Sequence, residues 1–381
     1  MIQVEWQVGL LGLEGGVVDL DTGIFRQAKH EDYITMSCGY DWLETVDPQI
    51  EAQLEEFISQ VYPVPEEREF MQRYCYYCLL GVHREKIFLV LNDLRGGWNG
   101  KSTFLSLLMA TMGSYAIKAD ASVLYKQDRT RGINDHSGGL LAFEKKRVMV
   151  IEETSSGAVL DEEKLKDWHG SRARVSGRQL HSKEMREFEW ITKLILAANE
   201  GKLPHWSVQD QALVERIATV PHRSRFQHPP LPDEPYTYPV DTHIKDKFPV
   251  WRPYMLRWCL GGRERYQEVG FTHMPPGCLA FKQTIMDEKD VVKEWLDTTV
   301  EGSGSDDFIK VCDLYTKFCS DNRSFQADRK TKKTPKMFER ELHRCLKKEH
   351  FKPKHHYKLH GKACMAGKVF IGYKIVDIEM I

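Results

Sequence analysis

Arg95-Gly96-Gly97-Trp98-Asn99-Gly100-Lys101-Ser102-Thr103 is the stretch that decides the fold of this 381-residue chain. The apolar run Ile87–Leu91 leads into it, and a helix-like pattern, Phe104–Met109, follows it. A strand, a glycine-rich turn, Lys-Ser and a helix in this order are the context of a phosphate-binding loop. In such a turn, successive backbone N–H groups converge on an anion, and the helix N-terminus adds partial positive charge. We therefore expect a nucleotide-binding α/β domain.

The residues of this turn have separate expected roles in binding ATP. Lys101 would reach the β- and γ-phosphates, and the Ser102 hydroxyl would ligate Mg²⁺. The expected nucleotide-binding residues are Gly96, Gly97, Asn99, Gly100, Lys101, Ser102 and Thr103. The usual template has glycine at position 95, where this chain has Arg95. The alternative is an ordinary glycine-rich turn that happens to precede a helix.

A second apolar strand, Arg147–Ile151, ends in two carboxylates, Glu152 and Glu153. ATPases use such a strand to hold Mg²⁺ and to polarise the attacking water. We therefore expect Ser102, Glu152 and Glu153 at the metal and Glu153 as the catalytic acid. The alternative is a strand that is followed by exposed acids.

Two further elements follow in the order that an ATPase requires. The strand Thr192–Ala197 precedes Asn199, whose amide could orient water beside the γ-phosphate, although an isolated Asn is usually a turn former. Arg216 is the first candidate for an arginine that reaches the nucleotide of a neighbouring subunit, and Arg225 is the second. Pairing of either arginine with a surface acid is the alternative.

The order of these elements resembles the superfamily 3 helicases, and more narrowly the poxvirus-type primase-helicases of large DNA viruses, phages and plasmids. The resemblance implies an AAA+ core that assembles as a hexameric ring and moves on single-stranded DNA. By position it assigns Glu153 as the catalytic acid, Asn199 as the sensor and Arg216 as the arginine finger. Ser155 and Arg172 stand where relatives often carry acids.

The same resemblance places a DNA-gripping hairpin between the acid strand and the sensor. Three basic residues of this interval, Arg178, His181 and Lys183, are the expected DNA-binding positions. Basic side chains in a ring channel would track phosphates, and each neutralised phosphate adds a salt-dependent contribution to affinity. Relatives frequently carry an amino-terminal primase that nothing here resembles, so a separate primase or polymerase partner is a further expectation.

The likeness covers most of the chain and predicts four segments. They are an α/β collar region at 1–84, the AAA+ ATPase core at 85–228, a linker and helical region at 229–301, and a winged-helix-like basic module at 302–381. Residues 326–374 carry about fifteen Lys or Arg against about four Asp or Glu, an asymmetry typical of a nucleic-acid-facing module. In that module the segments Asp307–Phe318 and Pro335–Lys348 should be helices. His356–Leu359, a turn from Gly361 to Gly367, and Val369–Val376 should form a basic hairpin. A solvated basic surface and a protein-docking module are the alternatives for this region.

Composition narrows the functional class further. The nine irregularly spaced cysteines favour a reducing compartment, and no apolar run is long enough to cross a membrane. We therefore expect an intracellular, soluble protein. The resemblance to the superfamily 3 helicases further implies that it acts in the host cytoplasm on single-stranded and forked duplex DNA. Two other classes stay open: a non-unwinding DNA-bound ATPase (an initiator, loading or packaging switch), and a catalytically degenerate DNA-binding AAA+ protein.

Overall fold

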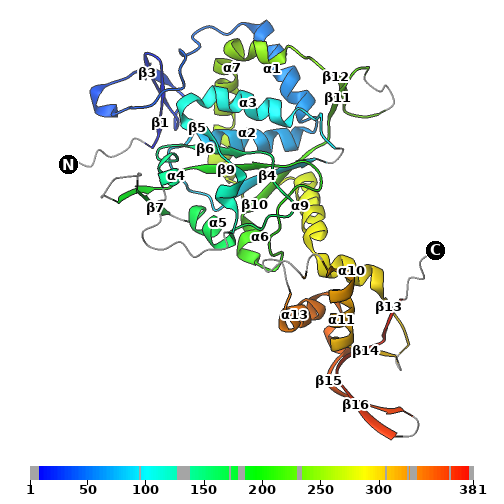
Figure 1. Cartoon of the computed structure of the whole chain (residues 1–381). Coiled ribbons are helices and arrows are strands. Elements are labelled where there is room, and N and C mark those ends of the chain that lie inside the picture. The colour runs from blue at the N-terminus through cyan, green and yellow to red at the C-terminus, as the bar shows by residue number, and fades with distance from the viewer. Residues whose placement is uncertain are drawn as a thin grey trace. The chain divides into compact units, whose positions relative to one another are not determined.

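The computed structural model describes residues 8–93, 96–126, 138–170, 173–178, 185–229, 234–304, 307–323, 326, 333–359 and 362–376. The chain forms two compact units, Met1–Lys282 and Gln283–Ile381 (Figure 1). In the first unit, the amino-terminal strands, the central sheet and helix α7 share one hydrophobic core. The four predicted segments stay predictions about the organisation of the chain within these two units.

A five-stranded parallel sheet forms the centre of the first unit. Its strands are β4 (Phe88–Asp93), β5 (Ala116–Lys118), β6 (Val148–Ile151), β9 (Lys193–Ala197) and β10 (Ile217–His222). Their order across the sheet is β10-β4-β9-β6-β5, and every neighbouring pair is parallel. The four strands other than β5 are buried along their whole length, as expected where helices cover both faces of a parallel sheet. The predicted α/β core is confirmed.

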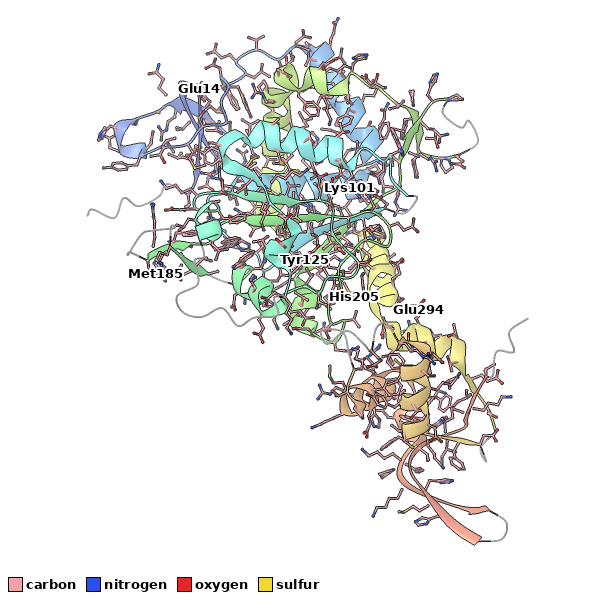
Figure 2. All side chains as sticks on the ribbon, viewed as in Figure 1. Glu14, Lys101, Tyr125, Met185, His205 and Glu294 are labelled. Carbon is pink, nitrogen blue, oxygen red and sulfur yellow. The ribbon has the colours of Figure 1, made fainter. Side chains whose placement is uncertain are left out.

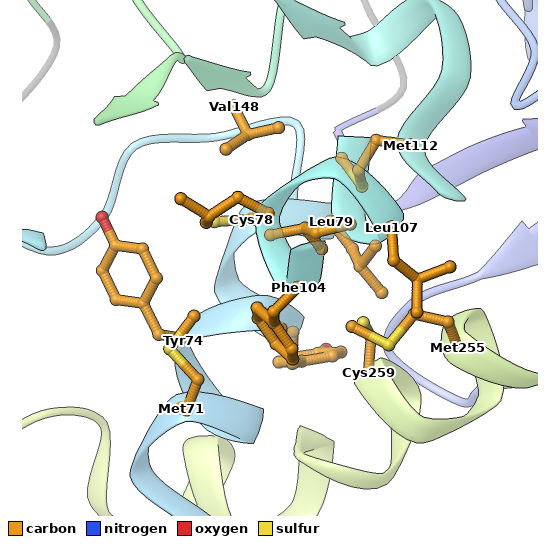
Figure 3. Close-up of a cluster of buried hydrophobic side chains, with 14 of the residues drawn as sticks. Met71, Tyr74, Cys78, Leu79, Phe104, Leu107, Met112, Val148, Met255 and Cys259 are labelled. Carbon is orange, nitrogen blue, oxygen red and sulfur yellow. The ribbon is translucent and has the colours of Figure 1, made fainter. Parts of the chain in front are cut away.

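Helices lie on both sides of this sheet (Figure 1). On one side are α1 (Pro48–Val61), α2 (Pro65–Leu79), α3 (Lys101–Met112) and α7 (Phe248–Gly261), and on the other are α5 (Glu162–Trp168), α6 (Gln211–Arg216) and α9 (Pro276–Lys289). Figure 3 shows Phe104 and Leu107 of α3 among side chains of α2 and α7. The helix that follows the glycine turn is therefore anchored by apolar packing rather than by a side-chain cap.

The remaining elements of the first unit are short. They are β1 (Leu10–Leu13), β2 (Gly16–Asp19), β3 (Phe25–Gln27), α4 (Gly138–Leu141), β7 (Arg174–Gly177), β8 (Arg186–Glu189), β11 (Arg225–Gln227), β12 (Thr237–Pro239), α8 (Arg263–Val269) and the 3₁₀ turns η1 (His30–Asp32), η2 (Gly113–Tyr115), η3 (Ala121–Leu124) and η4 (Ile244–Lys247). Strands β1–β3 form an antiparallel meander. The Tyr115 hydroxyl fastens it by accepting from the Gly12 N–H at 3.0 Å and donating to the Met36 carbonyl at 2.9 Å.

Two cations are buried where the central strands begin. Arg147 directly precedes β6 and donates to the carbonyls of Leu79 and Leu10, and Lys193 begins β9 and donates to the Leu80 carbonyl. Both residues lie at the C-terminus of α2, where the helix dipole favours positive charge. Burial lowers the pKa of Arg147 to about 10 and lowers the pKa of Lys193 far below its ordinary value.

The second unit contains α10 (Val291–Thr299), β13 (Val300–Gly302), β14 (Phe308–Lys310), α11 (Val311–Asp321), α13 (Pro335–Cys345), the 3₁₀ turn η5 (Lys348–His350), β15 (Phe351–Leu359), β16 (Lys362–Ile371) and β17 (Tyr373–Ile375). Its core includes Trp295, Phe318 and Phe338. Strands β15 and β16 form a long antiparallel hairpin that pairs with β14. The unit thus contains helices followed by a hairpin, and its description as a winged-helix-like module stays a prediction.

Several local predictions for this unit are wrong in detail. Phe308–Lys310 is a strand that pairs with β16, and the helix begins only at Val311. Strand β16 begins at Lys362, which pairs with Leu359 of β15, so Lys362–Gly367 belong to a strand rather than to the predicted Gly361–Gly367 turn. The core also takes Val292, Trp295 and Leu296 from α10, upstream of the predicted boundary at residue 302. Within the described part of the chain, no helix is long and apolar enough to cross a bilayer.

Two neighbouring histidines should make the stability of the first unit depend on pH. The rings of His83 and His169 lie 5.1 Å apart, and burial lowers their pKa values to about 2 and about 4. Unfolding returns each imidazole to a pKa of about 6.5, so the unfolded chain gains protons first as the pH falls below that value. The free energy of unfolding should therefore fall by about 1.4 kcal/mol per pH unit for each histidine.

Urea unfolding followed by tryptophan fluorescence between pH 6.5 and pH 5 measures this slope. His83→Leu should make the slope shallower by about 1.4 kcal/mol per pH unit, because one proton no longer distinguishes the two states. His243→Leu, at an exposed histidine, is the matched control and should leave the slope unchanged. Equal slopes in the His83 variant and the wild type would contradict the argument.

Candidate nucleotide-binding site

The glycine-rich turn between β4 and α3 has the backbone of a phosphate-binding loop. Gly96, Gly97 and Gly100 have φ values of 71°, 85° and 78°, in the left-handed region that glycine adopts without strain. At Gly100 a Cβ atom would lie 2.8 Å from Val61 Cγ2 and 3.0 Å from Phe226 Cε2, so a side chain has no room. Arg95, the departure from the usual template, lies outside the described residues.

Lys101 is held at the start of α3 by acceptors from two strands. Its Nζ donates to Asp93 Oδ1 at 2.5 Å and to the Ala198 carbonyl, and it lies 3.5 Å from Asn199 Oδ1. The side chain is only 4% exposed. Asn99 contacts the same carboxylate through Nδ2, and its Oδ1 accepts from the Lys101 N–H at 3.2 Å. The structure thus brings together the predicted residues Asn99, Lys101 and Asn199.

Asp93 is a site residue that the sequence reasoning missed. It is the last residue of β4, two positions beyond the predicted end of the strand, and its side chain is fully buried. Its Oδ2 has no hydrogen-bond partner in the described structure. The available signal was the pair Asn92-Asp93 directly after an apolar run, since a polar residue at that point lies where the strand meets the turn.

Glu152 lies beside Ser102 and Lys118. Its carboxylate accepts from Lys118 Nζ at 2.7 Å. Burial alone would raise the pKa of Glu152, but the hydrogen bond from Lys118, the nearby Ser102 hydroxyl and the Lys101 charge outweigh it and hold the pKa below its ordinary value. Lys118 at the end of β5 was not predicted, because a three-residue, half-exposed strand leaves almost no pattern.

This pair of oxygen ligands fits Mg²⁺. A hydroxyl oxygen and a nearby carboxylate are ligands that suit Mg²⁺, and the ion usually takes its other ligands from water and substrate phosphates. Among the described residues, no cluster of three or more His, Cys, Asp or Glu could hold a metal by itself. A cation at this position would therefore rely on Ser102, Glu152 and the bound phosphates.

Glu153 extends from the same strand end in an unusual conformation. Its φ is 59°, a left-handed value that costs a non-glycine residue about 1–2 kcal/mol. The side chain is exposed, whereas the next residue, Thr154, is buried and donates through Oγ1 to the Lys202 carbonyl at 2.7 Å. The backbone thus turns sharply after Glu152 and leaves the Glu153 carboxylate accessible. Such local strain is common at functional sites.

Arg216 lies at the end of the sheet where the parallel strands begin, opposite the glycine turn. It ends α6 directly before β10, whose first residue, Ile217, is level with Phe88 at the beginning of β4. Because β4 spans six residues at about 3.3 Å each, the backbone of Arg216 lies about 20 Å from the glycine turn of its own subunit. The second candidate, Arg225, begins β11, beside that turn, since the Phe226 N–H donates to the Trp98 carbonyl at 2.6 Å.

The interval between the acid strand and the sensor contains an antiparallel hairpin of β7 and β8. Arg178 directly follows β7, whereas His181 and Lys183 lie outside the described residues, as does Arg172. The hairpin is fastened at Arg174, which pairs with Glu187 at 3.0 Å. Figure 2 shows Met185, at the start of the returning strand, well separated from Lys101. The hairpin is therefore a separate surface from the nucleotide site.

The site residues come from the carboxyl ends of parallel strands and the turns that follow them. Asp93 ends β4, Lys118 ends β5, and Glu152 and Asn199 follow β6 and β9. The glycine turn follows β4, which lies between β10 and β9, and the acids follow β6, on the far side of β9. This arrangement is that of an α/β AAA+ core.

Comparison with known proteins shows which proteins this chain resembles. Residues 4–63 match the model described as D5 N terminal like. The putative helicase L207/L206 of Acanthamoeba polyphaga mimivirus is 26% identical over 321 residues, which are 80% of this chain and 32% of that protein. The chain thus spans about a third of the length of this curated relative. Together with the order of motifs, these matches support the resemblance of the chain to viral superfamily 3 helicase-primases.

Similar solved structures include helicases and a C-terminal region. The NrS-1 C-terminal region (305–718) has a TM-score of 0.42 and 9% identity, and covers 87% of this chain and 77% of that one. The JCV helicase has a TM-score of 0.30 and 17% identity, and covers 67% of this chain and 62% of that one. Both similarities are distant.

The Lys101–Asp93 ion pair should determine the stability of variants at Lys101. Lys101→Ala leaves the Asp93 carboxylate buried without its cation, which should cost about 3–5 kcal/mol of stability. The double variant Lys101→Met/Asp93→Asn removes both charges and should regain most of that loss. Urea unfolding at pH 7.5 measures both values. Wild-type stability in Lys101→Ala would contradict this role for the pair.

Proposed function

We propose that this chain is the motor of an ATP-driven DNA helicase of viral or mobile-element replication. The observation that carries the proposal is the convergence of Lys101, Ser102, Glu152 and Asn199 at one edge of the sheet. These residues come from three separate stretches of the sequence, and each has the chemistry that phosphoryl transfer to water requires.

Each residue has a separate role in hydrolysis under this proposal. The N–H groups of the turn and the Lys101 ammonium bind the triphosphate, and Ser102 and Glu152 would hold Mg²⁺, which supplies electrostatic stabilisation of phosphate charge. Glu153, exposed at the strand end, accepts the proton of the attacking water. Because it directly follows Glu152, its carboxylate could also contribute to the metal site. The Asn199 amide orients that water.

The position of Arg216 supports hydrolysis between subunits. At about 20 Å from its own turn, its guanidinium cannot stabilise the γ-phosphate of its own subunit. In a closed ring with repeating, head-to-tail contacts, the surface that carries Arg216 faces the next subunit. One arginine from each subunit then completes the site of its neighbour. We therefore propose a homohexameric ring that moves on single-stranded DNA at a fork.

DNA contacts are proposed at two places. The β7–β8 hairpin, with Arg178, His181 and Lys183, would follow the strand in the channel of the ring. The β15–β16 hairpin of the second unit carries the exposed residues Lys352 and Lys354, which suit backbone contacts to nucleic acid. We also propose that the protein acts in the host cytoplasm with a primase or polymerase carried on another chain or segment.

Mixing two inactive variants tests the site and the ring together. Lys101→Met/Asp93→Asn should abolish ATP hydrolysis without unfolding the chain, and Arg216→Ala should lower it by about 10³-fold or more. After subunit exchange in an equal mixture, about a quarter of the interfaces combine an intact lysine with an intact finger, so activity should partly return.

Phosphate release with and without single-stranded DNA is the measurement. A mixture that stays as inactive as its components would exclude a finger that acts across subunits. Hydrolysis and DNA binding without displacement of an annealed strand would instead indicate the non-unwinding ATPase. If the wild type shows no turnover, the degenerate DNA-binding protein is the correct class.

Arg178 provides a test of the DNA-binding hairpin. Arg178→Ala should weaken binding to single-stranded DNA and lower the salt dependence of binding by about 0.7 per phosphate contact, with basal ATP hydrolysis unchanged. Arg174→Ala, four residues earlier, breaks the Arg174–Glu187 pair within the hairpin and serves as the matched control. Fluorescence anisotropy at several salt concentrations measures both. Equal effects of the two substitutions would contradict a direct contact at Arg178.

A further inference from the structure

A buried histidine, His222, lies beside Asp93 at the end of the sheet that carries the nucleotide site. It ends β10, and the register of the parallel pair aligns it with Asp93, the last residue of β4. Residues aligned on neighbouring strands point to the same face of a sheet, and such strands lie about 4.8 Å apart. The Lys101 ammonium, which contacts Asp93, also acts on the His222 ring through its charge. His222, Asp93 and Lys101 therefore form one buried group.

Two members of this group lack hydrogen bonds that they could make. In the part of the chain that the structure describes, Asp93 Oδ2 has no partner, and neither ring nitrogen of His222 has one in hydrogen-bond geometry. The Val220 carbonyl is close enough to favour the protonated ring, but burial and the Lys101 charge outweigh it and lower the pKa of His222 to about 3. At neutral pH the imidazole is therefore uncharged, and Lys101 supplies the cation that Asp93 contacts.

We propose that His222 is a positioning residue that binds a proton and takes over the Asp93 carboxylate when a phosphate group draws the Lys101 ammonium away. The proposal rests on the proposed function, since it requires that the glycine turn binds a triphosphate. Each nucleotide that binds would then be accompanied by the uptake of a proton from solvent.

The exchange keeps the buried group balanced in charge. A carboxylate that is buried without its cation is strongly unfavourable, so Asp93 needs a new partner once the ammonium turns toward the phosphates. An imidazolium donates from both ring nitrogens, and Oδ2 is an acceptor with no other partner among the described residues. The pKa of His222 rises in the same step, because the cation that lowers it moves away and the anion beside it stays.

The other titratable groups described around His222 supply no competing charge. The Tyr62 ring lies 5.2 Å from the imidazole, and burial raises the pKa of Tyr62 far above its ordinary value, so the phenol stays neutral. The Cys278 thiol of α9, near Tyr62, stays protonated because burial raises its pKa as well. Arg223, the next residue along the chain, pairs with Glu67 of α2 at 2.6 Å. The ion pair at the glycine turn therefore decides whether the ring is protonated.

Counting protons during ATP binding tests the exchange. Isothermal titration calorimetry of the full chain with ATP and Mg²⁺, in buffers of different ionisation enthalpy, gives the number taken up. At pH 6.5 the wild type should take up about half a proton or more per ATP bound. His222→Gln keeps an N–H for Asp93 but cannot titrate, so this uptake should disappear. His83→Gln, at a buried histidine outside the group, is the matched control and should behave as the wild type does.

Uptake of a proton makes binding stronger at lower pH. Between pH 6 and pH 7 the dissociation constant of the wild type for ATP should rise about threefold more than that of His222→Gln. Thermal unfolding checks that each variant folds, and His222→Asn replaces His222→Gln if the glutamine variant does not.

The outcomes separate this proposal from the proposed function. A wild type that binds ATP without taking up a proton would overturn the role of His222 alone, and so would unchanged uptake in His222→Gln. A wild type that does not bind ATP would overturn the proposed function as well.

Discussion

The arrangement of the first unit depends on two cations buried at the beginning of its central strands. Arg147 and Lys193 donate to the last carbonyls of α2, and Arg147 also reaches Leu10 in the amino-terminal meander. These contacts join the meander, α2, β6 and β9 at the end of the sheet where the strands begin. Hydrogen bonds that involve a charged group contribute about 1.5–3 kcal/mol each, which helps to offset the cost of burying the charges. Because the strands are parallel, fixing their beginnings also fixes the edge that carries the site.

At the opposite end of the sheet, where the strands end, charged side chains already hold one another in place without a nucleotide. Asp93 engages both Lys101 and Asn99, and Lys118 engages Glu152. Under the proposed function, a phosphate group would compete with Asp93 for the ammonium of Lys101. The same contacts would keep the functional groups in position and lower the reorganisation required as charge develops in the proposed reaction. The site is thus ordered by pairs of opposite charge rather than by apolar packing alone.

The sequence alone predicted the residues that stand in recognisable strand–turn contexts. Lys101, Ser102, Glu152 and Asn199 follow apolar runs, and the structure brings them together. Asp93, Lys118, Arg147 and Lys193 were not predicted as partners, because a charged residue at a strand end looks the same in sequence whether it is exposed or buried. A cavity of about 350 Å³ beside the glycine turn could not be predicted either, since Gln53, Thr103, Phe226 and Trp251, which line it, meet only through the tertiary fold. The roles of Glu153 and Arg216, and those of the hairpin residues, stay predictions.

The central claim is that each catalytic site is completed by a neighbouring subunit. The most direct test is an electron cryo-microscopy structure of the full chain with single-stranded DNA and a non-hydrolysable ATP analogue. The account predicts a ring in which the Arg216 guanidinium of one subunit lies within hydrogen-bond distance of the γ-phosphate bound at Lys101 of the next. A nucleotide bound at Lys101 with no Arg216 from another subunit near its γ-phosphate would contradict it.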